Sequence, residues 1–156
     1  MKLIDTTLLA AVLAFSAPMA LPVGSANAAG IQTQMDVNAN ADVDVVKAQV
    51  SGDIMTIILM FRNTAGKRIE YDLNTAETYY IDKAANKKFF MLKDTEKKWV
   101  ASNVSYYSSS SAFKFKIDKE GKKLIWMKFP SPAAGVETID FSMPGVLPFD
   151  GLKVSR

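Results

Sequence analysis

Hydrophobic and polar residues alternate along most of the chain with a period of two, which is the pattern of β-strands with one buried face. Residues 43–50 alternate in this way, and residues 69–73 and 113–117 do so most regularly. Residues 54–61 are apolar on both faces, as expected of a strand at the centre of a sheet. Further strands are predicted at residues 79–82, 89–92, 99–101, 124–129 and 136–141, with polar turns between them.

This succession of about eight or nine short strands, at a spacing of roughly ten residues, predicts an antiparallel all-β fold. An immunoglobulin-like β-sandwich is the favoured architecture. A small up-and-down β-barrel is the alternative, because the number of strands does not distinguish the two. Two segments are not predicted as strands: residues 103–111 form a serine- and tyrosine-rich loop, and residues 130–135 form a proline-containing connection.

The start of the chain is typical of a secretory signal peptide. Lys2 supplies a positive charge, residues 8–15 are apolar, and Ala26 and Ala28 fit the small-residue pattern of a cleavage site. The apolar run is short for an uncleaved membrane anchor, and prolines follow it. We therefore expect a signal peptide over residues 1–28, a flexible polar lead-in over 29–42 and a single β-sandwich domain over 43–156. The protein would be exported, periplasmic or extracellular, without stable membrane insertion after cleavage.

The composition removes several classes of chemistry. The chain has no cysteine and no histidine, which excludes disulfides, thiol nucleophiles, Ser-His-Asp triads and histidine-ligated metal centres. A carboxylate hydrolase would need two acids across a cleft. Glu70, Asp72, Glu77 and Asp82 are near one another in the sequence, but they occupy turn or alternating positions where solvation explains them. We therefore predict a protein without catalytic activity and without a cofactor.

Aspartate and asparagine alternate at every second position from Asp36 to Asp44, and oxygen ligands in this spacing are typical of calcium loops. An EF-hand loop that began at Asp36 would require glycine at its sixth position and glutamate at its twelfth. Ala41 and Lys47 occupy those positions. We therefore interpret the segment as polar chain that leads into the first strand, and we predict no metal site.

Lysines lie beside aromatic residues at several places in the middle of the chain. Together with two tyrosines of the serine-rich loop they form the candidate interaction surface, which comprises Lys87, Lys88, Lys97, Lys98, Trp99, Tyr106 and Tyr107. Tyrosine and serine together are typical of recognition loops, because tyrosine offers rigid contact area and serine adaptable hydrogen bonds. Lysines at strand ends also prevent edge-to-edge aggregation, which is the alternative explanation of their placement.

The last third of the chain contains the sequence WMKFPSP at residues 126–132, a predicted strand at residues 136–141, and Pro-Gly and Pro-Phe pairs at residues 144–145 and 148–149. In this layout it resembles small exported bacterial domains of immunoglobulin-like fold. In the middle of the chain the resemblance includes residues 80–82, 87–89, 92–94 and 101–102, so that it spans residues 50–154. It implies a fold and a compartment, but no active site. The chain differs from antibody-type domains because it lacks their cysteine pair and because Trp126 lies late in the sequence.

These observations predict an exported interaction module of the bacterial cell envelope that has no catalytic activity. Its expected partner is an envelope protein or an anionic surface polymer, because lysines beside aromatic rings suit such partners and export argues against nucleic acid. The alternative is a small β-barrel that carries an apolar ligand.

Overall fold

The centre of the molecule is a pair of long antiparallel strands, β2 (Ala41–Ser51) and β3 (Ile54–Asn63). A two-residue turn joins them, and its first residue, Gly52, has a φ of 58°, which glycine adopts without strain. β1 (Gln32–Met35) pairs with β2, and β9 (Lys122–Pro130) pairs with β3, so the first sheet has the order β1-β2-β3-β9. The apolar segment 54–61 therefore lies between two neighbours, as its sequence predicts. These elements belong to a computed structural model that describes residues 31–107 and 110–156.

Two further sheets complete the fold. The second sheet has the order β11-β10-β5-β6, and the third sheet has the order β4-β8-β7. Their strands are β4 (Ile69–Asn74), β5 (Tyr79–Asp82), β6 (Lys87–Phe90), β7 (Val104–Tyr106), β8 (Ser111–Ile117), β10 (Thr138–Ser142) and β11 (Phe149–Lys153). The one helical element of the described residues is the short 3-10 turn η1 (Thr75–Glu77). All strand pairs in the three sheets are antiparallel.

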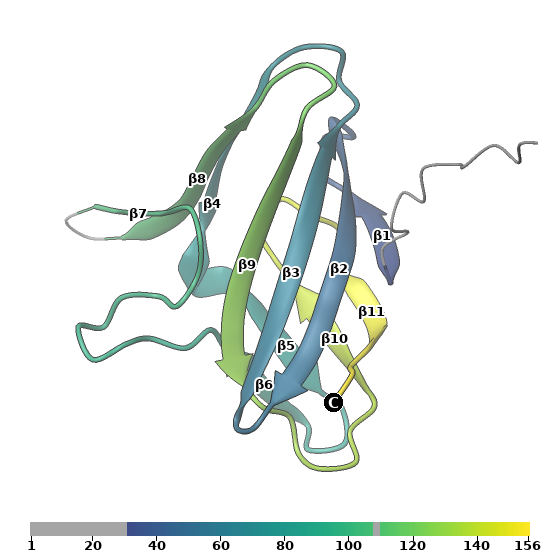
Figure 1. The fold of residues 1–156 in the computed structure, drawn as a ribbon, viewed down its shortest axis with the longest axis vertical. Coiled ribbons are helices and arrows are strands. Elements are labelled where there is room, and N and C mark those ends of the chain that lie inside the picture. The colour runs from purple at the N-terminus through teal and green to yellow at the C-terminus, as the bar shows by residue number, and fades with distance from the viewer. Residues whose placement is uncertain (1–30, 108–109) are drawn as a thin grey trace, which may run out of the picture.

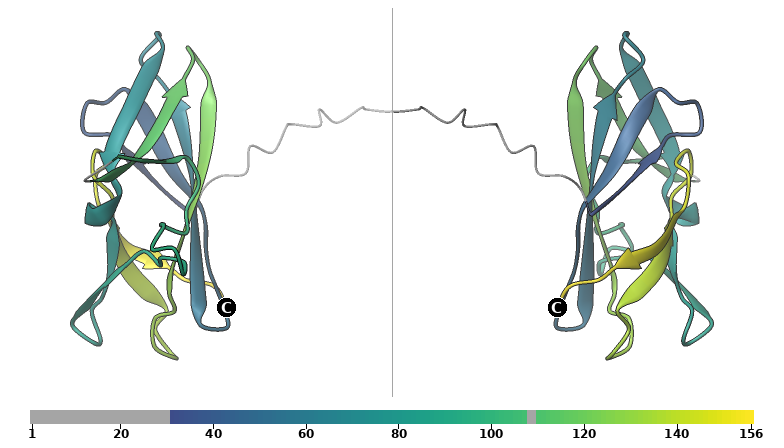
Figure 2. Two further views of the ribbon diagram at one scale, coloured as in Figure 1. Left: turned by 90° about the vertical axis from the view of Figure 1, so that its left-hand side faces the viewer. Right: turned by 90° about the vertical axis from the view of Figure 1, so that its right-hand side faces the viewer.

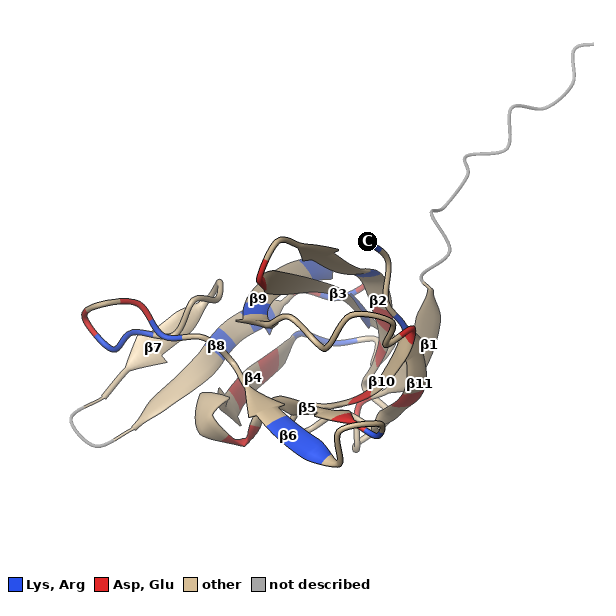
Figure 3. Cartoon of the chain, turned by 90° about the horizontal axis from the view of Figure 1, so that it is seen from below, with Lys and Arg blue, Asp and Glu red and all other residues tan. Residues whose placement is uncertain are grey.

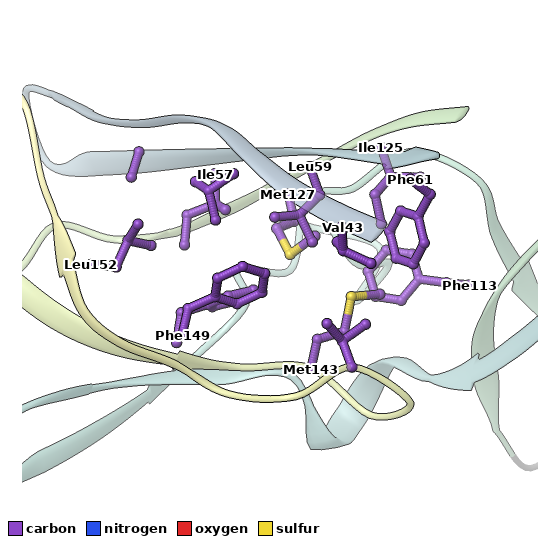
Figure 4. Packing of buried hydrophobic residues seen from close by; sticks show 14 of the residues in the cluster. Val43, Ile57, Leu59, Phe61, Phe113, Ile125, Met127, Met143, Phe149 and Leu152 are labelled. Carbon is purple, nitrogen blue, oxygen red and sulfur yellow. The ribbon is translucent and has the colours of Figure 1, made fainter. Parts of the chain in front are cut away.

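The first and second sheets face each other across a continuous apolar core (Figures 1 and 2). Ile57 and Leu59 of β3 are fully buried, and Phe149 approaches them from the second sheet (Figure 4). The rings of Phe129 and Phe141 meet across the layers with centroids 6.0 Å apart. The described residues thus form an antiparallel all-β sandwich, and their three ladders do not join into a closed barrel.

Three short segments that the sequence does not predict as strands contain strands in the structure. The lead-in predicted over residues 29–42 contains β1, and β2 already begins at Ala41. The loop predicted over residues 103–111 contains β7 and the first residue of β8. The tail after residue 141 contains β11, which pairs with β10. These strands have only three to five residues and little alternation, so only their partners identify them.

The segment 99–101 was predicted as a strand, but it forms only isolated bridges. It lies along the free edge of β9, where Ala101 bridges Met127 and the Lys128 N–H donates to the Val100 carbonyl at 3.0 Å. The Leu92 N–H donates to the Lys128 carbonyl at 2.8 Å, so the chain crosses from β6 to the first sheet at this point. The predicted signal peptide, residues 1–28, lies outside the described residues, which contain no helix long and apolar enough to cross a membrane.

Candidate functional site

The β7–β8 hairpin and the chain segment before it extend sideways from the sandwich (Figures 1 and 3). We call residues 93–107, which include Trp99, Tyr106 and Tyr107, the aromatic arm. β7 pairs only with β8, with Val104 opposite Phe113 and Tyr106 opposite Ser111. The arm therefore ends in β7, the edge strand of the third sheet, and it contains five of the predicted site residues: Lys97, Lys98, Trp99, Tyr106 and Tyr107.

Trp99 anchors the aromatic arm to the body of the protein. Its indole Nε1–H donates to Ser111 Oγ at 2.6 Å, and its ring packs against the edge of the hydrophobic core. The ammonium group of Lys93 lies 4.0 Å from the centroid of the same ring, which is a cation–π contact. Because the indole N–H and the face of the ring both have partners, the main role of Trp99 is to hold the arm in position, not to present an exposed binding surface.

Tyr106 and Tyr107 are the exposed rings of the arm, with 47% and 45% of their surfaces accessible. The Tyr106 hydroxyl donates to the Trp99 carbonyl at 3.3 Å. Lys114 of β8 donates to the Tyr107 hydroxyl at 3.1 Å, and this hydrogen bond raises the pKa of Lys114. Each ring is thus held by its polar end while its apolar surface faces solvent.

Lys97 and Lys98 lie in the turn that precedes Trp99. Asp94 Oδ1 accepts the backbone N–H groups of Glu96 and Lys98, both at 2.9 Å, and Lys97 has a φ of 61°. The ammonium group of Lys98 lies 2.7 Å from Glu96 Oε2. The turn therefore carries charges of both signs and is not the purely basic patch that the lysines alone predict.

Lys87 and Lys88 lie elsewhere, on the edge strand β6 of the second sheet (Figure 3). The ammonium group of Lys87 lies 5.0 Å from the Phe89 ring centroid, and that of Lys88 lies 3.7 Å from the Tyr79 ring centroid. The structure thus divides the predicted surface into the aromatic arm and this second site, which we call the β6 edge. Lysines on an edge strand also discourage strand pairing with other chains.

The alternating acidic segment from Asp36 to Asp44 does not converge on one point. Asp36 accepts the N–H of Asn40 at 2.6 Å and the Tyr71 hydroxyl at 2.9 Å. Arg62 binds Asp44 through two hydrogen bonds of 2.6 and 3.0 Å and holds the pKa of Asp44 below its ordinary value. No group of three or more acidic side chains within residues 31–107 and 110–156 is placed to hold a metal ion.

The sequence analysis did not single out the outer face of the first sheet. There Ile58 lies opposite Trp126, and Met60 lies opposite Leu124, so that four apolar side chains form one outward stripe. Leu124 and Trp126 are 44% and 36% exposed. The alternation of residues 122–130 carries this signal, because every second residue of the strand faces away from the core.

Of the four acids considered for hydrolysis, Glu70 and Asp72 of β4 line one small pocket together with Asp36, whereas Asp82 lines a different pocket. Glu70 pairs with Lys116 at 2.6 Å, Asp72 lies 3.6 Å from Lys114, and Glu77 accepts a hydrogen bond from Asn74. Asp82 is fully buried at the end of β5, so the expectation that solvation explains this acid was wrong. No family model matches the chain, and no curated protein and no solved structure matches it either.

Proposed function

We propose that the protein is an exported binding module without catalytic activity, and that its aromatic arm recognises a protein of the bacterial cell envelope. The observation that carries this proposal is the pair of tyrosine rings at positions 106 and 107. Both are about half exposed, and both are held by their hydroxyl groups. Ordered aromatic side chains lose little conformational entropy on binding and bury a large area, which is why recognition surfaces use them.

The charges around the arm favour a protein partner over a polyanion. Lys98 is paired with Glu96, and Lys114 lies 3.6 Å from Asp72. A surface of mixed charge gives specificity towards a partner of complementary pattern, whereas a phosphate-rich polymer is bound by unpaired basic groups. The signal-peptide pattern of residues 1–28 and the resemblance to small exported bacterial domains support the location in the cell envelope.

An anionic surface polymer is the second candidate partner, and the β6 edge is the observation that favours it. Lys87 and Lys88 are exposed neighbours, and neither forms an ion pair within the described part of the chain. Two adjacent lysines supply a weak, salt-sensitive attraction. This makes the polymer distinguishable from a protein partner by its response to salt.

The test is cross-linking of the tagged protein in intact cells, followed by mass spectrometry after washes at low and high salt. The double variant Tyr106→Ala/Tyr107→Ala should lose the captured protein. Phe90→Ala is the matched control, because Phe90 is also an exposed ring, with 47% of its surface accessible, but it lies on β6. Lys87→Gln/Lys88→Gln tests the β6 edge separately.

One dominant protein that survives the high-salt wash and is lost only in the tyrosine variant supports the proposal. Capture of a polymer that is lost at high salt and in the lysine variant contradicts the protein partner and favours the second candidate. Capture of nothing, or capture of a protein that the tyrosine variant retains, contradicts recognition through the aromatic arm.

A further inference from the structure

A cavity of about 600 Å³ lies at one end of the sandwich, between the β5–β6 turn and the connection from β9 to β10. In Figure 1 both connections are at the lower end of the molecule. The residues that line it include Asp82, Lys83 and Ala85 on one side and Gly135, Glu137 and Thr138 on the other. Loops that cluster at the end of a β-sandwich are common sites of ligand recognition.

The cavity wall contains the carboxylate of Asp82, of which only one oxygen has a hydrogen-bond donor among the described residues. Asp82 is the last residue of β5, and its side chain is fully buried, like that of Tyr80 two residues earlier. Its Oδ1 accepts the Ala85 N–H at 3.0 Å, whereas its Oδ2 has no hydrogen-bond partner among the described residues. A buried carboxylate oxygen without a donor is unfavourable, so a donor that reached it would gain a strong interaction.

The basic residue nearest to Asp82 in the sequence is engaged elsewhere. The Lys83 ammonium group lies 2.8 Å from Asp140 Oδ2, and Asp140 Oδ1 also accepts the Gly151 N–H. The hydrogen bond to Asp140 raises the pKa of Lys83, which keeps the lysine charged in that pair. Glu137, the other acid in the cavity wall, forms no ion pair within the described residues. Among the charged residues that line the cavity, the two without an ion-pair partner in the described residues, Asp82 and Glu137, are therefore both acidic.

The wall opposite Asp82 is held in place before any ligand binds. The guanidinium group of Arg156 donates to the Ala133 carbonyl at 2.8 Å and to the Val136 carbonyl at 2.7 Å. The Val136 N–H also donates to the Ala133 carbonyl, which closes the turn between these two residues. A preformed wall lowers the ordering cost of binding and is typical of ligand sites.

We propose that this cavity binds a primary ammonium group, with Asp82 Oδ2 as the acceptor and the Glu137 carboxylate near the rim. A guanidinium group binds a carboxylate best through both oxygens, and at Asp82 it would have to share Oδ1 with the Ala85 N–H. An ammonium group is a compact point charge that one oxygen can accept. The cavity is large enough to admit a free diamine or a lysine side chain of another chain. The proposal does not depend on the aromatic arm.

Binding should move the β5–β6 turn. Asp82 is fully buried, so an ammonium group that reaches Oδ2 must shift the chain around this residue, and the exposed turn residues Ala84 and Ala85 follow it directly. The amide signals of Ala84, Ala85 and Gly135 are therefore the reporters of choice. They lie on the two walls of the cavity and away from the aromatic arm.

The experiment is an NMR titration of the full-length ¹⁵N-labelled protein. The probes are 1,4-diaminobutane and Nα-acetyl-lysine-N-methylamide, and the neutral controls are 1,4-butanediol and the Nε-acetylated lysine compound. We expect saturable shifts of the three reporter signals with either amine, and none with the neutral compounds. Asp82→Asn keeps an acceptor for the Ala85 N–H but removes the charge, and should weaken binding at least about tenfold.

Two further variants calibrate the result. Glu137→Gln should weaken binding by about two- to threefold, because an exposed charge is screened by solvent. Glu120→Gln, which removes an exposed acid that does not line the cavity, should change nothing. If Asp82→Asn fails to fold, the decisive measurement is the salt dependence of amine binding to the unaltered protein, because an ion pair must weaken as salt is added.

Saturation with diaminobutane alone identifies a free amine as the ligand source, and saturation with the lysine compound alone identifies a peptide. Both results support the proposal. Three results would overturn it: no shift at about 20 mM of either amine, equal shifts with the neutral compounds, or unchanged binding by Asp82→Asn. In the salt experiment, affinity that does not respond to salt would also overturn it.

Discussion

The Tyr71 hydroxyl donates to Asp36 Oδ2 at 2.9 Å and thereby joins β4 of the third sheet to the turn that follows β1. The other oxygen of Asp36 accepts the backbone N–H groups of Asn40 and Ala41. Burial and this hydrogen bond both raise the pKa of Tyr71, so the phenol stays a donor over the ordinary pH range. A single buried carboxylate thus closes the first turn and connects two sheets.

Tyr71→Phe should lower the free energy of unfolding by about 1–2 kcal/mol, because the buried Asp36 oxygen loses its donor while the ring packing is kept. Urea unfolding followed by circular dichroism measures this change. Tyr106→Phe is the control, since the Tyr106 hydroxyl is exposed and makes one long hydrogen bond. Equal stability of Tyr71→Phe and the unaltered protein would show that the Tyr71–Asp36 bond contributes nothing.

Arg62 should make the stability of the protein depend on acid pH. Its hydrogen bonds to Asp44 keep the pKa of Asp44 below the ordinary value of 3.8. Since the pKa is lower in the folded state, the stabilisation is complete above about pH 4 and is lost as the pH falls through the folded value. Arg62→Gln should therefore cost about 1 kcal/mol near neutral pH, after allowance for the exposure of Arg62, and progressively less below about pH 3.

Urea unfolding at a series of pH values gives this profile. Arg68→Gln is the matched control, because the Arg68–Asp118 pair is strongly exposed at both ends and should contribute almost nothing at any pH. A cost of Arg62→Gln that is the same at pH 2.5 and at pH 7 would contradict the assignment to Asp44.

Phe129→Ala should destabilise the protein by about 3–5 kcal/mol, because loss of the ring leaves a cavity between the two facing sheets. The Phe129 ring is fully buried and packs edge-on against Tyr80 and Phe141. Phe90→Ala removes the same side chain from an exposed position and should change stability by less than about 0.5 kcal/mol. Differential scanning calorimetry of both variants makes the comparison, and similar melting temperatures would contradict the described core.

Trp99→Phe should loosen the aromatic arm and cost about 1 kcal/mol, because the hydrogen bond from Nε1 to Ser111 is lost. Amide hydrogen exchange should accelerate at Tyr107, whose N–H bonds the Ser110 carbonyl within the same hairpin. Trp126→Phe, on the outer face of the first sheet, should leave this exchange unchanged. Acceleration in both variants alike would mean that Trp99 has no special role in holding the arm.

Much of the fold follows from the local pattern. The segment 54–61, apolar on both faces, is the central strand β3, and the alternating segments 69–73 and 113–117 lie within the paired strands β4 and β8. Such patterns report which face of a strand is buried, and that information is contained in a few neighbouring residues. The short edge strands β1, β7 and β11 carry too little of it. The proline-containing connection was predicted to begin at residue 130, but Pro130 is the last residue of β9 and pairs with Ile54.

The arrangement of the sites depends on contacts between distant parts of the chain. Lys87 and Lys98 are close in the sequence, but the crossing at Leu92 places β6 on one sheet and the segment after it along another. The cavity beside Asp82 needs residues 133–138, about fifty positions later, to form its second wall. The sequence alone determined the class of fold and the faces of its main strands, because these depend on local alternation. Only the tertiary structure decided which side chains meet, because strand partners are selected by packing and backbone hydrogen bonds over the whole domain.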